Sequence, residues 1–217
     1  MASIPEPAKE RLLHLMRLLE KQGAEPVTSA QVELLTGWPG HRIRKDISYL
    51  GGQGGETAGD GPAGSNPGLG SNSGYSAELL IPAIRKALNL DRRRLFCLAG
   101  LGRLGSAFLN FSPAELGEFD LAAGFDTNVN RVEILPSRVP LYPAYKMGEI
   151  IGRFSIEMAL LCVPAGAAQE TAEKLAAAGI RGILNFAPVA LRLPPAVAVR
   201  NVYLADELRG LAVKMGN

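Results

Sequence analysis

Three closely spaced glycines are the residues of this sequence best suited to bind a ligand. Gly100, Gly102 and Gly105 form a GxGxxG pattern, in which the first glycine allows a tight turn, the second lets backbone approach a pyrophosphate, and the third lets a helix pack closely on a strand. The pattern follows the apolar run 95–99 and opens a predicted helix over 103–110, whose free N–H groups attract phosphate. We therefore predict a dinucleotide site, with binding residues Gly100, Leu101, Gly102, Arg103, Leu104 and Gly105.

Asp126 is the next candidate, because it lies 21 residues after Gly105, at the end of a predicted strand over 121–125. A carboxylate at this point accepts hydrogen bonds from a ribose diol and repels a 2′-phosphate, which favours NAD(H) over NADP(H). Two other interpretations stay open: Asp126 caps the following turn, and Arg131 nearby softens the discrimination. Arg103 either neutralises phosphate or is an ordinary exposed helix residue.

The sequence offers no convincing proton donor for hydride transfer, which usually requires a positioned His or Tyr. The two histidines, His14 and His41, lie far ahead of the glycine pattern. Tyr142 and Lys146 fit a YxxxK pattern, but Tyr142 follows Gly100 by only 42 residues and Pro143 disfavours the helix that this pattern needs. We therefore predict no catalytic residue and no enzyme, and keep an oxidoreductase only as an alternative that steady NADH turnover with a carbonyl substrate would revive.

A basic helical stretch near the N-terminus is the second candidate site. Ile43, Ile47 and Leu50 share one face of the predicted helix. A DNA recognition helix needs such an apolar back together with cations and hydrogen-bonding groups toward the groove. The alternative is a solvated basic face; the cluster is local, because residues 1–50 hold seven Lys or Arg against six Asp or Glu. The predicted DNA-binding residues on the opposite face are His41, Arg42, Arg44, Lys45, Ser48 and Tyr49.

Three short helices are predicted in the first fifty residues. One covers 5–23, a second starts at a capping box on Thr28 and ends at Gly37, and a third begins with Pro39 and runs to about Leu50. Their number and spacing are typical of a helix-turn-helix module.

A glycine-rich segment separates the basic helix from the rest of the chain. Residues 51–74 contain ten glycines, two prolines, three serines and two asparagines, which predicts an exposed, flexible loop. A helix over 76–88 follows, in which Pro82 either introduces a kink or marks the true beginning.

Beyond Asp91 strands alternate with helices. Further apolar strands are predicted at 156–163 and 182–186 and a helix at 167–178, and such alternation favours a parallel sheet covered on both faces. A last helix starts at Leu204 and carries Leu208, Leu211 and Met215 on one face.

The composition is that of an ordinary globular protein. The 217 residues, 47% hydrophobic and 20% charged with a net charge of +2, suggest two domains. No apolar run approaches the roughly 18 residues of a membrane span, and the start of the chain lacks a secretory signal, so we expect a cytoplasmic protein. Cys97 and Cys162 lie in apolar runs without metal-site spacing, which predicts buried free thiols and no metal.

Together the two modules resemble the Rex family of bacterial redox-sensing repressors, in which a winged helix is fused to an NAD(H)-binding Rossmann domain. The resemblance implies an α/β fold with a winged helix-turn-helix domain over 1–75 (wing 51–74), a Rossmann-like parallel-sheet domain over 76–203, and an exchanged dimerisation helix over 204–217. It rests on IRKDISYLG (43–51), AIRKALNLDR (83–92), AGLGRLGSA (99–107), GFD (124–126), LLCVPAGAAQE (160–170) and GIRGILNFAPV (179–189).

The resemblance also implies a function. Rex-like proteins are homodimers that bind double-stranded operator DNA when NAD⁺ prevails and release it when NADH binds, with no membrane partner. By this resemblance Phe186 senses the nicotinamide ring near the two-fold axis, and Pro164 and Ala165 line its pocket. The loop that lies at the nicotinamide consists of Asn185, Phe186, Ala187 and Pro188.

Three departures from the family pattern leave a second function open. The wing carries Glu56 and Asp60, and no Lys or Arg occurs between Lys45 and Arg85. Trp38 replaces the usual small polar cap before the recognition helix, at some expected cost to that helix. Phe111 stands where many relatives have a tyrosine that can hydrogen-bond across the dimer. The alternative is therefore a divergent NAD(H)-binding sensor with weakened DNA binding that acts through a protein partner.

Overall fold

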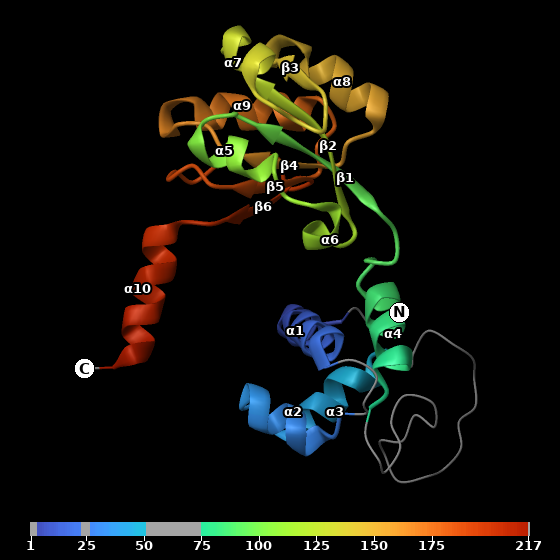
Figure 1. Cartoon of the computed structure of the whole chain (residues 1–217). Helices are drawn as coiled ribbons and strands as arrows, with labels where there is room; N and C mark the ends of the chain where they lie inside the picture. The colour runs from blue at the N-terminus through green and yellow to red at the C-terminus, as the bar shows by residue number, and fades with distance from the viewer. Residues whose placement is uncertain (1–3, 23–26, 51–74, 217) are drawn as a thin grey trace. The chain divides into compact units, whose positions relative to one another are not determined.

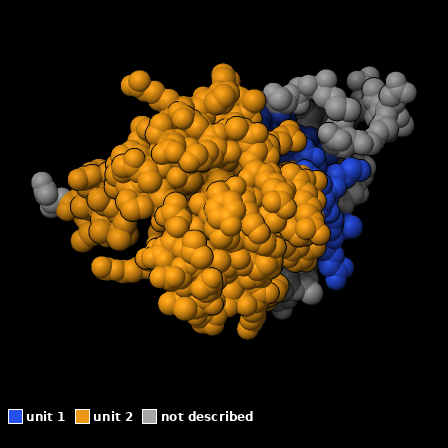
Figure 2. All heavy atoms as spheres, turned by 90° about the horizontal axis from the view of Figure 1, so that it is seen from above, with its two compact units in different colours: residues 1–92 blue, residues 93–217 orange. Residues whose placement is uncertain are grey.

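The computed structural model divides the chain into two compact units, Met1–Arg92 and Arg93–Asn217 (Figure 2). It describes residues 4–22, 27–50 and 75–216. The glycine-rich segment expected to form the wing, 51–74, lies outside the described residues.

The first unit is a small helical domain around one apolar core (Figure 1). It contains α1 (Glu6–Gln22), α2 (Ser29–Thr36), α3 (Gly40–Ser48) and α4 (Ala77–Ala87). An isolated antiparallel bridge joins Val27 to Tyr75. Because α4 packs its buried Leu80 and Ile84 into this core, the unit extends past residue 75, where the winged-helix domain was predicted to end. Pro82 lies inside α4 and does not mark its beginning.

The ends of α2 follow the predicted capping pattern. The Thr28 hydroxyl accepts the Gln31 N–H, and the Gln31 side chain accepts the Thr28 N–H. Gly37 ends the helix at φ +71°, a left-handed conformation that glycine adopts without strain. The prediction for Pro39 was wrong by one position: it is the N-cap of α3 with ψ 136°, and Gly40 is the first helical residue.

The second unit is built on a six-stranded, all-parallel sheet with strand order β3-β2-β1-β4-β5-β6. This is the order of the doubly wound dinucleotide-binding fold. The four central strands occur where the apolar runs predict them. The short edge strands β3 and β6 were not predicted, because their residues are half-buried or exposed and form no continuous apolar run. The strands are β1 (Arg94–Ala99), β2 (Phe119–Asp126), β3 (Leu141–Pro143), β4 (Met158–Leu161), β5 (Gly182–Asn185) and β6 (Ala198–Asn201).

Both faces of the sheet are covered, as the apolar strands predict. Cys97 and Ala99 of β1 belong to one core, whereas Phe96 and Leu98 belong to another, because successive strand side chains point to opposite faces. The helices are α5 (Arg103–Phe108), α6 (Pro113–Leu116), α7 (Val129–Ile134), the 3₁₀ turn η2 (Ala144–Lys146), α8 (Met147–Phe154), α9 (Ala165–Ala177) and α10 (Leu204–Met215). None of the helices described is both long and apolar enough to cross a membrane.

Candidate functional site

The strand order places the predicted nucleotide loops together at the carboxyl ends of the central strands. β1 and β4 are neighbours, and the chain leaves β1 toward β2 on one side and β4 toward β5 on the other. The carboxyl ends of parallel strands at such a switch point border the crevice where ligands bind in this type of sheet. The glycine loop follows β1, and Pro164 follows β4 as the N-cap of α9.

The three glycines have different roles in the loop. Gly100 has φ +93°, and a Cβ there would lie 2.8 Å from the carbonyl oxygen of Cys162. A Cβ on Gly105 would lie 1.9 Å from the carbonyl oxygen of Gly100. Gly102, the N-cap of α5, has no heavy atom within 4 Å of the same position. The first and third glycines are therefore required by the fold itself, whereas Gly102 borders open space that a ligand can occupy.

Asp126 is the buried acceptor that holds this loop. Its carboxylate accepts the N–H groups of Leu101 (2.7 Å) and Asn128 (2.8 Å) and a guanidinium N–H of Arg131 (3.1 Å). Burial alone would raise the pKa of Asp126, but these hydrogen bonds and the charge of Arg131 hold it below its ordinary value. Asp126 therefore caps the following turn and also pairs with Arg131, and these are the two interpretations that the sequence left open.

A carboxylate offers about four lone-pair sites, so about one remains on Asp126 for a ribose hydroxyl. Leu101 is buried in the core and its N–H is already donated to Asp126, so it positions the loop. Arg103 and Leu104 are exposed on the first turn of α5.

The loop over 185–188 begins at the carboxyl end of β5, on the same side of the sheet as the glycine loop. Asn185 has 0% exposure, and its side-chain oxygen accepts the Ala187 N–H at 3.0 Å while its amide donates to the Val189 carbonyl at 2.9 Å. Ala187 is buried and Pro188 is exposed. The Phe186 ring is half-buried, 5.4 Å from the ring of Phe108 on α5.

Phe111 extends this aromatic contact. Its ring lies 5.2 Å from that of Phe108 and is 43% exposed. A line of rings therefore joins the loop after β5 to the end of the helix that begins at the glycine loop.

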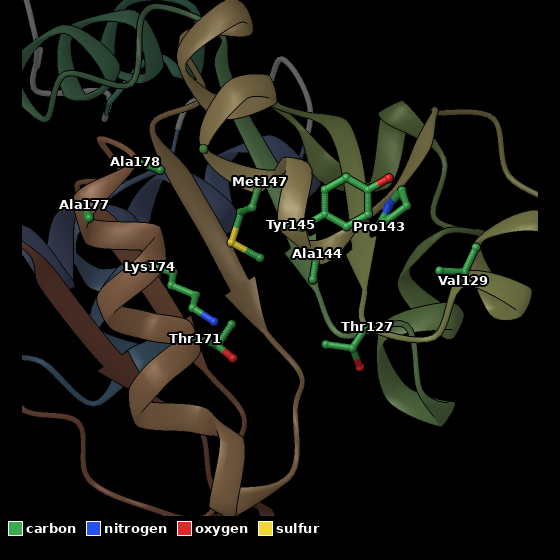
Figure 3. A pocket seen from close by; sticks show the side chains of 11 residues that line it. Thr127, Val129, Pro143, Ala144, Tyr145, Met147, Thr171, Lys174, Ala177 and Ala178 are labelled. Carbon is green, nitrogen blue, oxygen red and sulfur yellow. The ribbon is translucent and has the colours of Figure 1, made fainter.

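A cavity of about 720 Å³ is bordered by Thr127, the residue after Asp126. Figure 3 shows Thr171 and Lys174 projecting from α9 toward Thr127. Sequence reasoning missed these residues, because small and polar side chains on the outer face of a helix give no periodic signal. The cavity is lined by Thr127, Val129, Pro143, Ala144, Tyr145, Met147, Gly148, Thr171, Lys174, Ala177 and Ala178.

The basic helix α3 has the two faces that the sequence predicts. Ile43 and Ile47 are buried in the first core, together with Leu50 just beyond the helix. The side chains His41, Arg42, Arg44, Lys45 and Ser48 are exposed, and Tyr49, the C-cap residue, is half-buried.

Asp46 does not share the exposed face of α3. Its two oxygens accept Nε and Nη2 of Arg11 on α1 at 2.6 and 2.8 Å, and its side chain is 6% exposed. This bidentate pair anchors α3 to α1 and leaves the exposed face of α3 cationic. Sequence reasoning counted Asp46 only as one acid among six, because nothing in the local pattern identifies Arg11 as its partner.

The N-terminus of α3 receives its cap from another helix. Oε2 of Glu33 on α2 accepts the Gly40 N–H at 3.0 Å. Trp38 packs instead against the core and meets the His14 ring at 5.2 Å, edge to face. The cost expected from Trp38 in the capping region is therefore offset by Glu33.

Comparison with known proteins decides the family. The CoA binding domain family matches residues 93–189. The redox-sensing transcriptional repressor Rex of Thermus thermophilus is 38% identical over 96% of this chain and 90% of its own length. The chain belongs to the Rex family. The Rex of Ligilactobacillus salivarius is 32% identical, over 96% of this chain and 92% of its own.

Solved Rex structures share the fold along the whole chain. RSP, a Rex-family repressor, was solved in complex with β-NAD⁺ and operator DNA, and this chain matches it with a TM-score of 0.81 and 28% identity over 99% of this chain and 94% of RSP. A structure of RSP with β-NADH matches with a TM-score of 0.80, at 28% identity over 99% and 95% of the two chains. The predicted Rossmann-like domain behind an N-terminal helical domain is thereby confirmed.

The cysteines of this Rex-family chain are free. Cys97 is buried and Cys162 half-buried, and burial raises the pKa of each thiol to about 12. Within the described ranges, no group of three or more His, Cys, Asp or Glu could hold a metal ion.

Asp46→Asn should lower the free energy of unfolding of the first unit by about 2 kcal/mol, because it leaves the partly buried guanidinium of Arg11 without its charge partner. Trp38 is the single tryptophan of the sequence, so its fluorescence during urea unfolding reports on this unit. Glu6→Gln is the control in the same unit: it breaks a surface ion pair with Lys9, in which the Glu6 side chain is 80% exposed, and should change the free energy of unfolding far less. Equal losses would show that the Arg11–Asp46 pair contributes no more than a surface pair.

Proposed function

We propose that this chain is an NADH/NAD⁺-responsive DNA-binding repressor that acts as a homodimer and releases operator DNA when NADH binds. The observation that carries the proposal is the presence of both parts on one Rex-family chain: a glycine loop open to a ligand at Gly102, and a helix whose exposed face carries cations while its one acid is buried against Arg11. Operator DNA is cytoplasmic in bacteria, so the protein works there. It acts by binding and performs no catalysis.

The sheet order supports one direction for the coenzyme. Asp126 ends β2, the glycine loop follows β1, and Asn185 ends β5, so these groups succeed one another along the edge of the sheet. The adenosine would enter the cavity beside Thr127, and the pyrophosphate would lie over Gly102. The nicotinamide would then reach Pro164, Ala165 and the loop formed by Asn185, Phe186, Ala187 and Pro188.

The response requires that the two coenzyme forms differ in affinity for two arrangements of the dimer, because a ligand that binds both arrangements equally shifts nothing. The oxidised ring carries a positive charge that the reduced ring lacks. A coupling of about 1–3 kcal/mol changes DNA affinity roughly 5- to 150-fold.

The last helix is the proposed link between subunits. α10 buries none of its residues, and its exposed apolar side chains fit exchange against the N-terminal unit of the partner subunit. These side chains are Leu204, Leu208, Leu211, Val213 and Met215.

The direct test is a fluorescence-anisotropy titration on a palindromic duplex, selected from a random library by rounds of binding in NAD⁺. DNA affinity with NADH should be at least about 5-fold lower than with NAD⁺. Equal affinity in both coenzymes would overturn redox-responsive repression, and no binding in either at low salt would overturn DNA binding altogether.

A second function, that of a sensor acting on a protein partner, is favoured by the absence of Lys and Arg between Lys45 and Arg85. The salt dependence of DNA binding separates the two functions. Each phosphate neutralised should contribute about −0.9 to the slope of log K against log salt. A slope near zero would favour the protein-partner function.

Phe186→Ala should leave DNA affinity in NAD⁺ unchanged and reduce the NADH-induced loss of DNA affinity to less than about 2-fold. The ring of Phe186 packs on Phe108, next to the proposed nicotinamide position. Without this ring, a change in the oxidation state of the nicotinamide has no contact through which it reaches the rest of the chain. The same titration measures the effect. Phe154→Ala, which removes a 40% exposed ring of α8, serves as the control, and a normal NADH response of the Phe186 variant would refute the sensing role.

A further inference from the structure

The start of α10 is hydrogen-bonded to the loop over 185–189. The hydroxyl of Tyr203, the N-cap residue of α10, donates to the Val189 carbonyl at 2.6 Å. The same hydroxyl accepts from the side-chain amide of Asn185 at 3.4 Å, and this amide also donates to Val189 and to Asn201 Oδ1, at 2.9 Å each. A single cluster therefore joins both ends of the loop to the last residue before the helix.

The hydrogen-bonded groups around Asn185 and Tyr203 cannot easily move one at a time. Asn185 is completely buried, and each of its side-chain polar atoms has a partner within the chain. A buried amide that loses its partners pays the full desolvation cost, so the loop and the groups that bind Asn185 must move together. The backbone adds a second tie, because the Val202 N–H donates to the Asn185 carbonyl at 2.9 Å.

The helix beyond this cluster has no other anchor in the second unit among the described residues. α10 contains no buried residue, and β6, which leads into it, is half-buried at most. The orientation of the first turn of α10 is therefore controlled at residues 201–203, where Asn201 bonds the Asn185 end of the loop and Tyr203 bonds Val189 at its other end.

We propose that Tyr203 is a positioning residue that transmits a displacement of the loop over 185–189 to α10 through its hydroxyl. This inference rests on the proposed function, in which the loop lies at the nicotinamide and α10 exchanges with the partner. A shift of the Val189 carbonyl on exchange of NAD⁺ for NADH pulls the Tyr203 hydroxyl with it and turns the N-terminus of α10. The hydroxyl is bonded within the chain to Val189 and Asn185, so its removal should uncouple the two events without weakening either.

The test is Tyr203→Phe, which keeps the ring and removes only the hydroxyl. NADH affinity, measured by calorimetry, and DNA affinity in NAD⁺ should each stay within about 2-fold of the parent chain. The NADH-induced loss of DNA affinity should fall from the parent value, about 5-fold or more, to less than about 2-fold. Tyr142→Phe, in β3, controls for the loss of a phenol hydroxyl elsewhere in the same unit.

A purely structural role of the cluster predicts a different pattern. Asn201→Ala removes one partner of Asn185 but leaves the Tyr203–Val189 hydrogen bond, and should keep the full NADH response. If Asn201→Ala blunts the response as much as Tyr203→Phe, general loosening of the cluster suffices and the proposal is overturned. A full response of Tyr203→Phe overturns it directly.

Hydrogen–deuterium exchange on the parent chain tests the same coupling without any variant. Exchange of NAD⁺ for NADH should change the protection of residues 185–189 and of residues 202–208 together; a change in the first segment alone overturns the proposal. A parent chain that shows no NADH effect on DNA affinity contradicts the proposed function itself, and this result is distinguishable from the failure of Tyr203 alone.

Discussion

Gly102→Glu is expected to fold like the parent chain and to bind NADH at least about 100-fold more weakly. A Cβ at Gly102 would meet no heavy atom within 4 Å apart from its chain neighbours, so the substitution should not disturb the backbone of the loop. The new carboxylate instead occupies the space above the N-terminus of α5, where the pyrophosphate would lie, and repels its charge. A loss of about 2.7 kcal/mol corresponds to the expected 100-fold change in Kd. Calorimetric titration with NADH measures it.

Two further variants make this result specific to the loop. Gly152→Glu adds the same side chain to α8, where a Cβ also has no heavy atom within 4 Å, and should leave NADH affinity unchanged. Gly105→Ala places a Cβ 1.9 Å from the Gly100 carbonyl oxygen, so it should lower stability before it affects binding. Unchanged NADH affinity of Gly102→Glu would show that the pyrophosphate lies elsewhere.

The sequence predicts the glycine loop well because its determinants are local. The turn at Gly100 and the close approach at Gly105 are backbone requirements that only glycine meets, and the apolar strand before them is a continuous run. The hydrogen-bond partners of Asp126 could not be predicted as well from the sequence. The carboxylate binds Leu101, which precedes it by 25 residues, and only the sheet register brings β1 and β2 together.

The basic helix α3 shows the same division between local and long-range determinants. Helical periodicity identifies Ile43 and Ile47 as the buried side and the cations as the exposed side. The groups that orient the helix come from other elements: Arg11 of α1 is 35 residues from Asp46, and Glu33 of α2 caps Gly40. The helical periodicity of one segment contains no information on such pairs, so the sequence predicts the exposed basic face of α3 but not the groups that hold the helix in place.

The charge on α3 leads to the second large effect. Arg44→Glu combined with Lys45→Glu is expected to weaken DNA binding at least about 100-fold at low salt, with NADH affinity unchanged. Both side chains are exposed, and neither pairs with an acid among the residues that the structure describes. If each contacts one phosphate in each subunit, their loss should make the slope of log K against log salt less steep by roughly 3 to 4, at about 0.9 per phosphate. Anisotropy titrations from low to moderate salt measure both quantities.

The control must carry the same change in charge away from the helix. Arg138→Glu combined with Arg181→Glu alters two exposed arginines of the second unit and should reduce DNA affinity far less, because screening limits charges beyond about 10 Å of the phosphates at ordinary ionic strength. Equal losses in the two double variants would indicate that only net charge matters and that α3 has no special position on the duplex. A large loss in the α3 variant alone, with a shallower salt slope and intact NADH binding, is the result that a paired recognition helix requires, because two helices of a dimer must meet successive major grooves about 34 Å apart.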